Sequence, residues 1–100
     1  MTSYAHLPGG DLIEQGIADG AAGRITPASC LVAIGRTRLG RAGINFSNDC
    51  IRLIAEPERQ LYQLLCQESN DPYSRYNSLI RRLISFEQTL ERQLARRHAS

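Results

Sequence analysis

The chain has 100 residues, of which 42% are hydrophobic and 22% are charged, and its formal net charge is +2. This composition is ordinary for a globular protein and excludes an intrinsically disordered chain. The length predicts one domain that buries its own core, and the small net charge does not by itself indicate a nucleic-acid-binding protein.

The basic residues and the cysteines give further indications of the class of protein. All twelve basic residues are arginines, which are better bidentate partners of carboxylates and phosphates than lysines. The cysteines, Cys30, Cys50 and Cys66, include no closely spaced pair, so we expect reduced thiols in a cytoplasmic protein and no zinc site. The first residues do not resemble a secretory signal, and no apolar run is long enough to span a membrane.

Caps, apolar positions and helix breakers together predict an all-α fold. An irregular lead-in over residues 1–10 precedes helices that we expect at residues 11–22, 27–34, 37–42, 49–55, 57–67 and 71–97. Two of these starts, Thr26-Pro27 and Asp71-Pro72, carry a capping residue followed by proline. We therefore predict a small single-domain bundle of about five helices, in which short N-terminal helices pack on one long C-terminal helix.

One motif in residues 27–44 resembles a nucleotide-binding loop. Gly35 and Gly40 have the spacing of G-x-x-x-x-G-K-[ST], and an apolar run precedes them. However, Arg41 replaces the lysine that contacts the phosphates, and Ala42 replaces the hydroxyl that binds Mg²⁺. The sequence also predicts no further strands for an α/β fold, so we do not expect this segment to bind a nucleotide.

The same segment has a second interpretation as a helix-turn-helix. A helix, a glycine turn and a second helix carrying arginines would suit a DNA groove. The arginines concerned are Arg36, Arg38 and Arg41. The second helix would be short and would contain Gly40, and the simpler interpretation is a helical hairpin with solvated arginines.

The C-terminal stretch predicts the element on which the others pack. Asp71 can cap the first turn, Pro72 suits the first helical position, and no glycine or proline follows. At 100° per residue, most apolar side chains of this stretch fall within an arc of about 160°. They are Tyr73, Tyr76, Leu79, Ile80, Leu83, Ile84 and Phe86. A helix needs an arc of this width in order to bury itself in its own domain.

Beyond Phe86 the arc narrows to Leu90 and Leu94, as in a helix that contacts a single partner helix. About 26 residues make a rod of roughly 39 Å, whereas a compact chain of this size is only about 33 Å across. We therefore expect the end of the helix to protrude and to form a homodimer. The expected interface consists of Phe86, Glu87, Leu90 and Leu94. The alternative is that the last two turns fray in solvent.

The polar side of the same helix carries charge of one sign. Within an arc of about 120° lie Arg75, Arg81, Arg82, Arg92 and Arg96. These are candidate contacts for nucleic-acid phosphates or for an acidic protein partner, and the simpler interpretation is a solvated surface. Glu87 and Glu91 lie on another side of the helix, where we expect them to meet arginines of a neighbouring helix or subunit.

No pattern in the sequence supports catalysis. His6 and His98 lie near the two ends without a recognisable nucleophile or acid partner, and Glu56 and Glu58 suit a helix start. We therefore expect no enzyme activity, no cofactor and no metal. The leading prediction is a non-catalytic helical protein-interaction domain that homodimerises through its last helix. The alternative is a nucleic-acid-binding protein that uses the arginine face or the segment 27–44.

Overall fold

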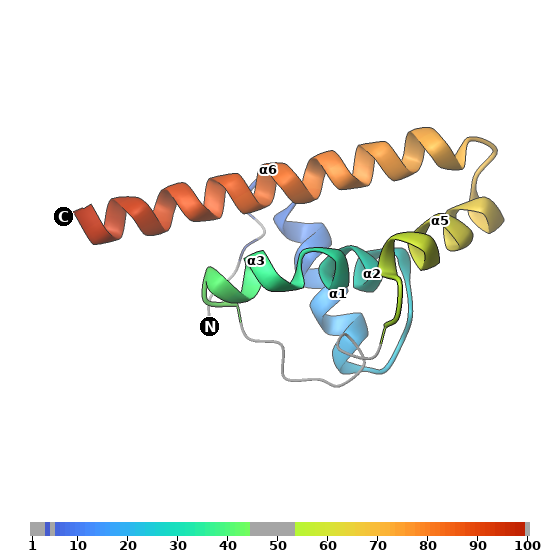
Figure 1. Cartoon of the computed structure of the whole chain (residues 1–100), viewed down its shortest axis with the longest axis horizontal. Coiled ribbons are helices and arrows are strands. Elements are labelled where there is room, and N and C mark those ends of the chain that lie inside the picture. Colours follow the sequence, from blue (N-terminus) through green and yellow to red (C-terminus); the bar gives the residue numbers. More distant parts are fainter. Residues whose placement is uncertain (1–3, 5, 45–53, 100) are drawn as a thin grey trace.

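The computed structural model describes residues 4, 6–44 and 54–99, with side chains as far as residue 96. Its helices are α1 (Gly10–Ala21), α2 (Pro27–Ile34), α3 (Arg36–Arg41), α5 (Pro57–Glu68) and α6 (Pro72–Ala99) (Figure 1). The predicted all-α bundle is confirmed, and these five helices begin and end within two residues of the predicted bounds. The predicted helix at 49–55 falls largely on residues 45–53, outside the described residues, and residues 54–55 are not helical.

Local hydrogen bonds explain two of the helix starts. The Thr26 hydroxyl accepts from the Ser29 backbone N–H at 3.2 Å, and the Ser29 hydroxyl accepts from the Thr26 N–H at 2.8 Å. This reciprocal capping box begins α2. At the start of α6, the Asp71 carboxylate accepts from the Ser74 N–H at 3.2 Å. Hydrogen bonding to the Ser74 side chain, followed by this N–H, lowers the pKa of Asp71. Both caps are those that the sequence predicts.

Helix α2 lies at the centre of the bundle. It packs against α1, α3, α5 and α6, and Cys30, Leu31 and Val32 are fully buried within it. The approach of α1 is especially close, because a Cβ atom on Gly16 would lie 2.3 Å from the Ala28 carbonyl oxygen. Gly16 therefore lets the two helices touch through backbone atoms.

Helix α6 runs along the whole molecule and past the end of α3 (Figure 1). Its 28 residues make an unbroken rod of about 42 Å, which sets the longest of the molecular dimensions, 47 × 28 × 21 Å. The backbone approaches α6 closely at one further point, since a Cβ on Gly9 would lie 2.8 Å from the Arg82 carbonyl oxygen. Gly9 has a φ of 74°, so it provides both the left-handed turn before α1 and this close approach.

Most residues of the expected oligomer interface are buried inside the folded chain, on the inner face of α6. Phe86 is fully buried within the chain, and Glu87 and Leu90 are only 5% and 6% exposed. Tyr4 covers Phe86, with ring centroids 5.8 Å apart in an edge-to-face arrangement. The part of α6 that protrudes from the body therefore begins only after Leu90. The reason is that α3 and the N-terminal segment cover more of α6 than a spherical body would.

Candidate binding surfaces of α6

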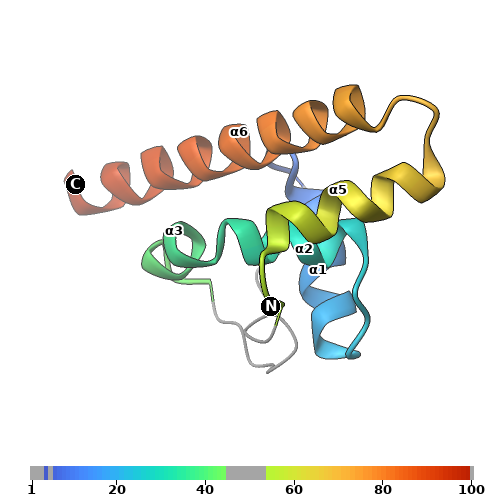
Figure 2. The same ribbon diagram turned by 45° about the vertical axis from the view of Figure 1, so that its right-hand side comes forward.

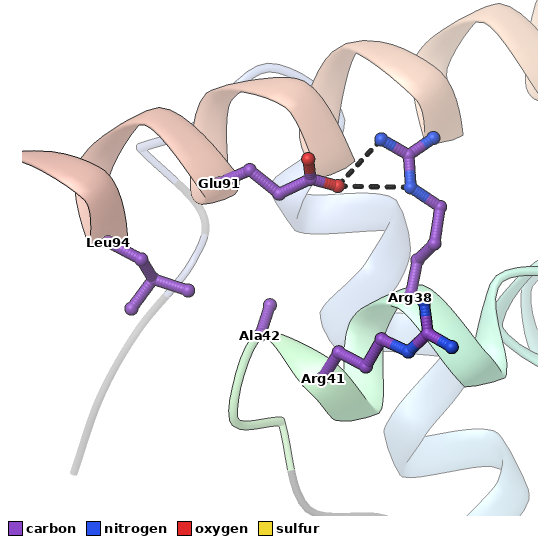
Figure 3. A pocket seen from close by; sticks show the side chains of 5 residues that line it. All are labelled: Arg38, Arg41, Ala42, Glu91 and Leu94. Atoms are coloured by element: carbon purple, nitrogen blue, oxygen red, sulfur yellow. Dashed lines mark hydrogen bonds and ion pairs between the residues drawn. The ribbon is translucent and has the colours of Figure 1, made fainter.

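Ion pairs hold α3 and α6 against each other. The Arg38 Nε and NH2 groups donate to Glu91 Oε1 at 3.0 and 2.6 Å (Figure 3). The NH1 group of Arg38 donates to Glu87 Oε1 at 3.4 Å. Both acids of α6 therefore meet an arginine of a neighbouring helix, as predicted. Arg38 was also a candidate nucleic-acid contact, and the structure uses it inside the fold instead.

Glu87 is the buried member of this cluster. Burial raises the pKa of the Glu87 carboxyl, the Arg38 guanidinium partly opposes that shift, and the Glu91 charge adds to it. A Cβ atom on Gly35 would lie only 3.0 Å from Glu87 Oε2, so the glycine makes room for the carboxyl group. Arg38, Glu87 and Glu91 thus join α3 to α6, and Gly35 leaves the space that this contact needs. We call this cluster the Arg38 clamp.

A shallow hollow of about 340 Å³ lies beside this clamp, between the end of α3 and the C-terminal part of α6 (Figure 3). Its lining residues are Arg38, Arg41, Ala42, Glu91 and Leu94. Leu94 is half-buried here, so only the last of the four residues predicted for the oligomer interface keeps exposed apolar surface. Arg38 and Glu91 neutralise each other in the hollow, and Arg41 is its third charged lining residue.

The segment 27–44 does not adopt helix-turn-helix geometry. Only Gly35 separates α2 from α3, whereas the motif uses a turn of three or four residues between helices at a steep angle. In both views α3 continues in the direction of α2 (Figures 1 and 2). Arg36 and Arg41 are exposed on this short helix, but the segment lacks the turn that a DNA-reading helix requires.

One face of α6, which we call the outer face, carries only arginine, serine and threonine side chains. Seven positions on it recur at alternating spacings of three and four residues, and six of the seven are exposed. We call this set the arginine line: Arg75, Ser78, Arg82, Ser85, Thr89, Arg92 and Arg96. The line is about 32 Å long. It includes four of the five arginines that the sequence placed on this face, and the fifth, Arg81, is exposed beside it.

No acidic side chain lies on the arginine line, and within the described part of the chain none of its arginines forms an ion pair. The two acids of α6 lie on the side that faces α3. The polar part of α6 thus has an acidic side, which pairs with Arg38 of α3, and a cationic outer face whose arginines form no ion pair with any described residue.

A second flank of α6, next to α5, carries exposed apolar side chains. Tyr73 is 67% exposed, Ile84 is 41% exposed, and Tyr62 of α5 is 39% exposed. Tyr62 and Tyr76 pack edge to face with ring centroids 6.1 Å apart. Ile84 lies at the margin of the predicted apolar arc, and this marginal position is the signal in the sequence that could have identified the flank.

Comparison of the chain with protein-family models, with curated proteins and with solved structures gives no match. Among the described residues, no group of three or more histidine, cysteine or acidic side chains is arranged to hold a metal ion. Over the same ranges, no helix is both long and apolar enough to cross a bilayer.

Proposed function

We propose that the chain is a non-catalytic binding module, and that the arginine line of α6 is its contact surface for a polyanionic partner. The observation that carries this proposal is a row of arginine guanidinium groups with serine hydroxyls between them along about six turns of one helix, without an acid among them. The Thr89 hydroxyl in the same row donates to the Ser85 carbonyl oxygen at 2.9 Å. Arginine binds phosphate and carboxylate groups in a bidentate manner, and serine and threonine hydroxyls donate to the same oxygens.

The distribution of charge over the whole chain supports this proposal. The chain has ten acidic residues, enough to pair with most of its arginines, yet none lies on the arginine line. Arg92 and Arg96 are one turn apart, a spacing at which like charges destabilise a helix. A bound polyanion would relieve this repulsion, so the surface has an electrostatic reason to bind one.

Binding to immobilised heparin, as a generic polyanion, tests the proposal. We expect the wild-type chain to be retained at low salt, and the triple variant Arg82→Gln/Arg92→Gln/Arg96→Gln to elute at markedly lower salt. The matched control is Arg36→Gln/Arg41→Gln/Arg59→Gln, which removes the same charge from exposed sites elsewhere. Equal losses in the two triple variants would contradict a specific role for α6.

Self-association is the second candidate function. It is favoured by the exposed flank of Tyr73 and Ile84, which lie three turns apart on one line of α6, with Tyr62 of α5 exposed as well. The buried side chains of Phe86 and Leu90 do not provide this contact in the folded chain. Self-association and polyanion binding use different sides of α6 and are therefore compatible. A cytoplasmic location stays a prediction.

A further inference from the structure

We infer that the partner of the arginine line is the phosphate backbone of a nucleic-acid duplex. This inference rests on the proposed function and names the class of polyanion. It follows from three properties of the outer face of α6, namely the side chains between its arginines, the position of its aromatic neighbours, and its length.

The side chains between the arginines favour phosphate over a protein surface. They are Ser78, Ser85 and Thr89, and the line contains no apolar residue. Protein interfaces depend on apolar or aromatic anchors that become buried at the centre of the contact. Phosphate contacts, in contrast, come mainly from arginine together with serine, threonine and other short polar side chains. The composition of the line is therefore that of a backbone-contacting surface.

The position of the tyrosines favours a duplex over a single strand. Proteins that bind single strands stack bases on aromatic side chains beside their basic groups. Tyr73 and Tyr76 of α6 lie on or near the flank next to α5, and Tyr73 is about 150° around the helix from the middle of the arginine line. Tyr4 lies against the other edge of the line, where it packs edge to face on the buried Phe86 ring. Among the described residues no aromatic side chain therefore belongs to the arginine line itself, and a duplex presents phosphates without requiring a stacked base.

The length of the line also suits a duplex. It is straight, it is part of one unbroken helix, and it spans about 32 Å. One turn of DNA is about 34 to 36 Å long. A rod of this length can cross the backbone of one helical turn with arginines near both of its ends. With Arg81 included, five arginines are available for phosphates on this face.

The test uses the full chain and four probes, each supplied at the same total concentration of negative charges. The probes are a mixed-sequence DNA duplex of about two turns, an RNA duplex of the same length, one of the DNA strands alone, and poly-glutamate. Binding is measured by fluorescence anisotropy against each labelled probe over a range of salt concentrations. We expect a duplex to bind at least tenfold tighter than the single strand, and poly-glutamate to bind more weakly than either.

The salt dependence gives a second, quantitative expectation. Five phosphate contacts on a duplex predict a slope of log K against log salt of about −4.5, which is roughly a 500-fold loss of affinity between 50 and 200 mM salt. Removing two contacts with Arg82→Gln/Arg92→Gln should reduce the slope by about 1.8. The control Arg36→Gln/Arg41→Gln should leave the slope unchanged, and circular dichroism should show both variants folded.

The outcomes separate this inference from the function on which it rests. A duplex preference with the expected slopes supports both. Equal or tighter binding of the single strand or of poly-glutamate, lost in the α6 variant, overturns the duplex inference and leaves a polyanion-binding surface. No binding of any probe or of heparin at low salt overturns both. Duplex binding with equal slope changes in the two variants also overturns the inference, because it removes the arginine line from the contact.

Discussion

Asp19 is a buried carboxylate near the end of α1 that joins three parts of the chain. Its Oδ1 accepts from the Gln15 side-chain amide at 2.9 Å and from Arg24 NH2 at 3.2 Å, and its Oδ2 accepts from the Thr26 hydroxyl at 2.7 Å. These interactions, with the Thr26 hydrogen bond first, lower the pKa of Asp19 although burial opposes the shift. One side chain thus positions the turn after α1 and the cap of α2.

We predict that Asp19→Asn lowers the free energy of unfolding at pH 7 by about 2 kcal/mol, because hydrogen bonds to a charged group are weakened. Since the folded-state pKa is lowered, this stabilisation is full above the unfolded pKa of about 3.9 and is lost as the pH falls through the folded value. Urea unfolding at several pH values measures both effects. Asp11→Asn, at an exposed site on the same helix, should have little effect, and an equal loss there would contradict the prediction.

At the scale of the elements, α3 is attached to the rest of the fold through Gly35 and through the Arg38 clamp on α6. We predict that Glu87→Gln does not lower stability at pH 7, and that the stability of the variant relative to the wild type rises as the pH passes upward through the folded-state pKa of Glu87. The folded-state pKa of Glu87 is raised, so its favourable contribution is present below the unfolded pKa of about 4.3 and is lost as the pH rises through the folded value. The neutral amide avoids the desolvation of a buried charge.

The measurement for the clamp is the urea midpoint of Glu87→Gln as a function of pH. Its advantage over the wild type should vanish below about pH 4, where the wild-type carboxyl is also neutral. Glu58→Gln, at an exposed site on α5, is the matched control and should shift neither curve. A lower midpoint of the Glu87 variant at pH 8 would mean that the Arg38 ion pair outweighs the burial of the charge.

The bounds of the helices were predictable because local chemistry sets them. Thr26-Pro27 and Asp71-Pro72 cap their helices as the sequence predicts, and Gly35 ends α2. The charge pattern of α6 was predictable for the same reason, since angular position along one helix depends only on spacing. All five arginines predicted for its outer face are exposed.

Tertiary partners were not predictable from spacing. Nothing in the sequence near Arg38 indicates that it reaches Glu91, 53 positions away. Cys66 is exposed, because the buried line of α5 runs through Leu61 and Leu65 and the next residue turns 100° away from it. The side chains that line the hollow likewise come from segments far apart in the chain.

At the scale of the whole molecule, the elongated shape explains why Leu90 is buried in the core and not exposed on a protruding helix end. A compact chain of this size would form a sphere about 33 Å across, whereas the molecule is 47 Å long and 21 Å thick. A body extended along α6 covers more of that helix than a sphere does. The apolar surface that stays exposed on α6 therefore lies mainly on its flank, at Tyr73 and Ile84, about 140° around the helix from the middle of the arginine line.

This geometry leads to a prediction about assembly. If two copies pair through the flank, their arginine lines stay free, and we expect sedimentation equilibrium to give the mass of two chains. Ile84→Asp should give the mass of one folded chain, because a charge at a partly exposed site is tolerated in the monomer but not in an apolar contact. Leu90→Asp is the contrasting variant and should unfold the chain, because its site is inside the core. A wild-type mass of one chain at the highest soluble concentration would rule out pairing and leave α6 with its cationic face alone.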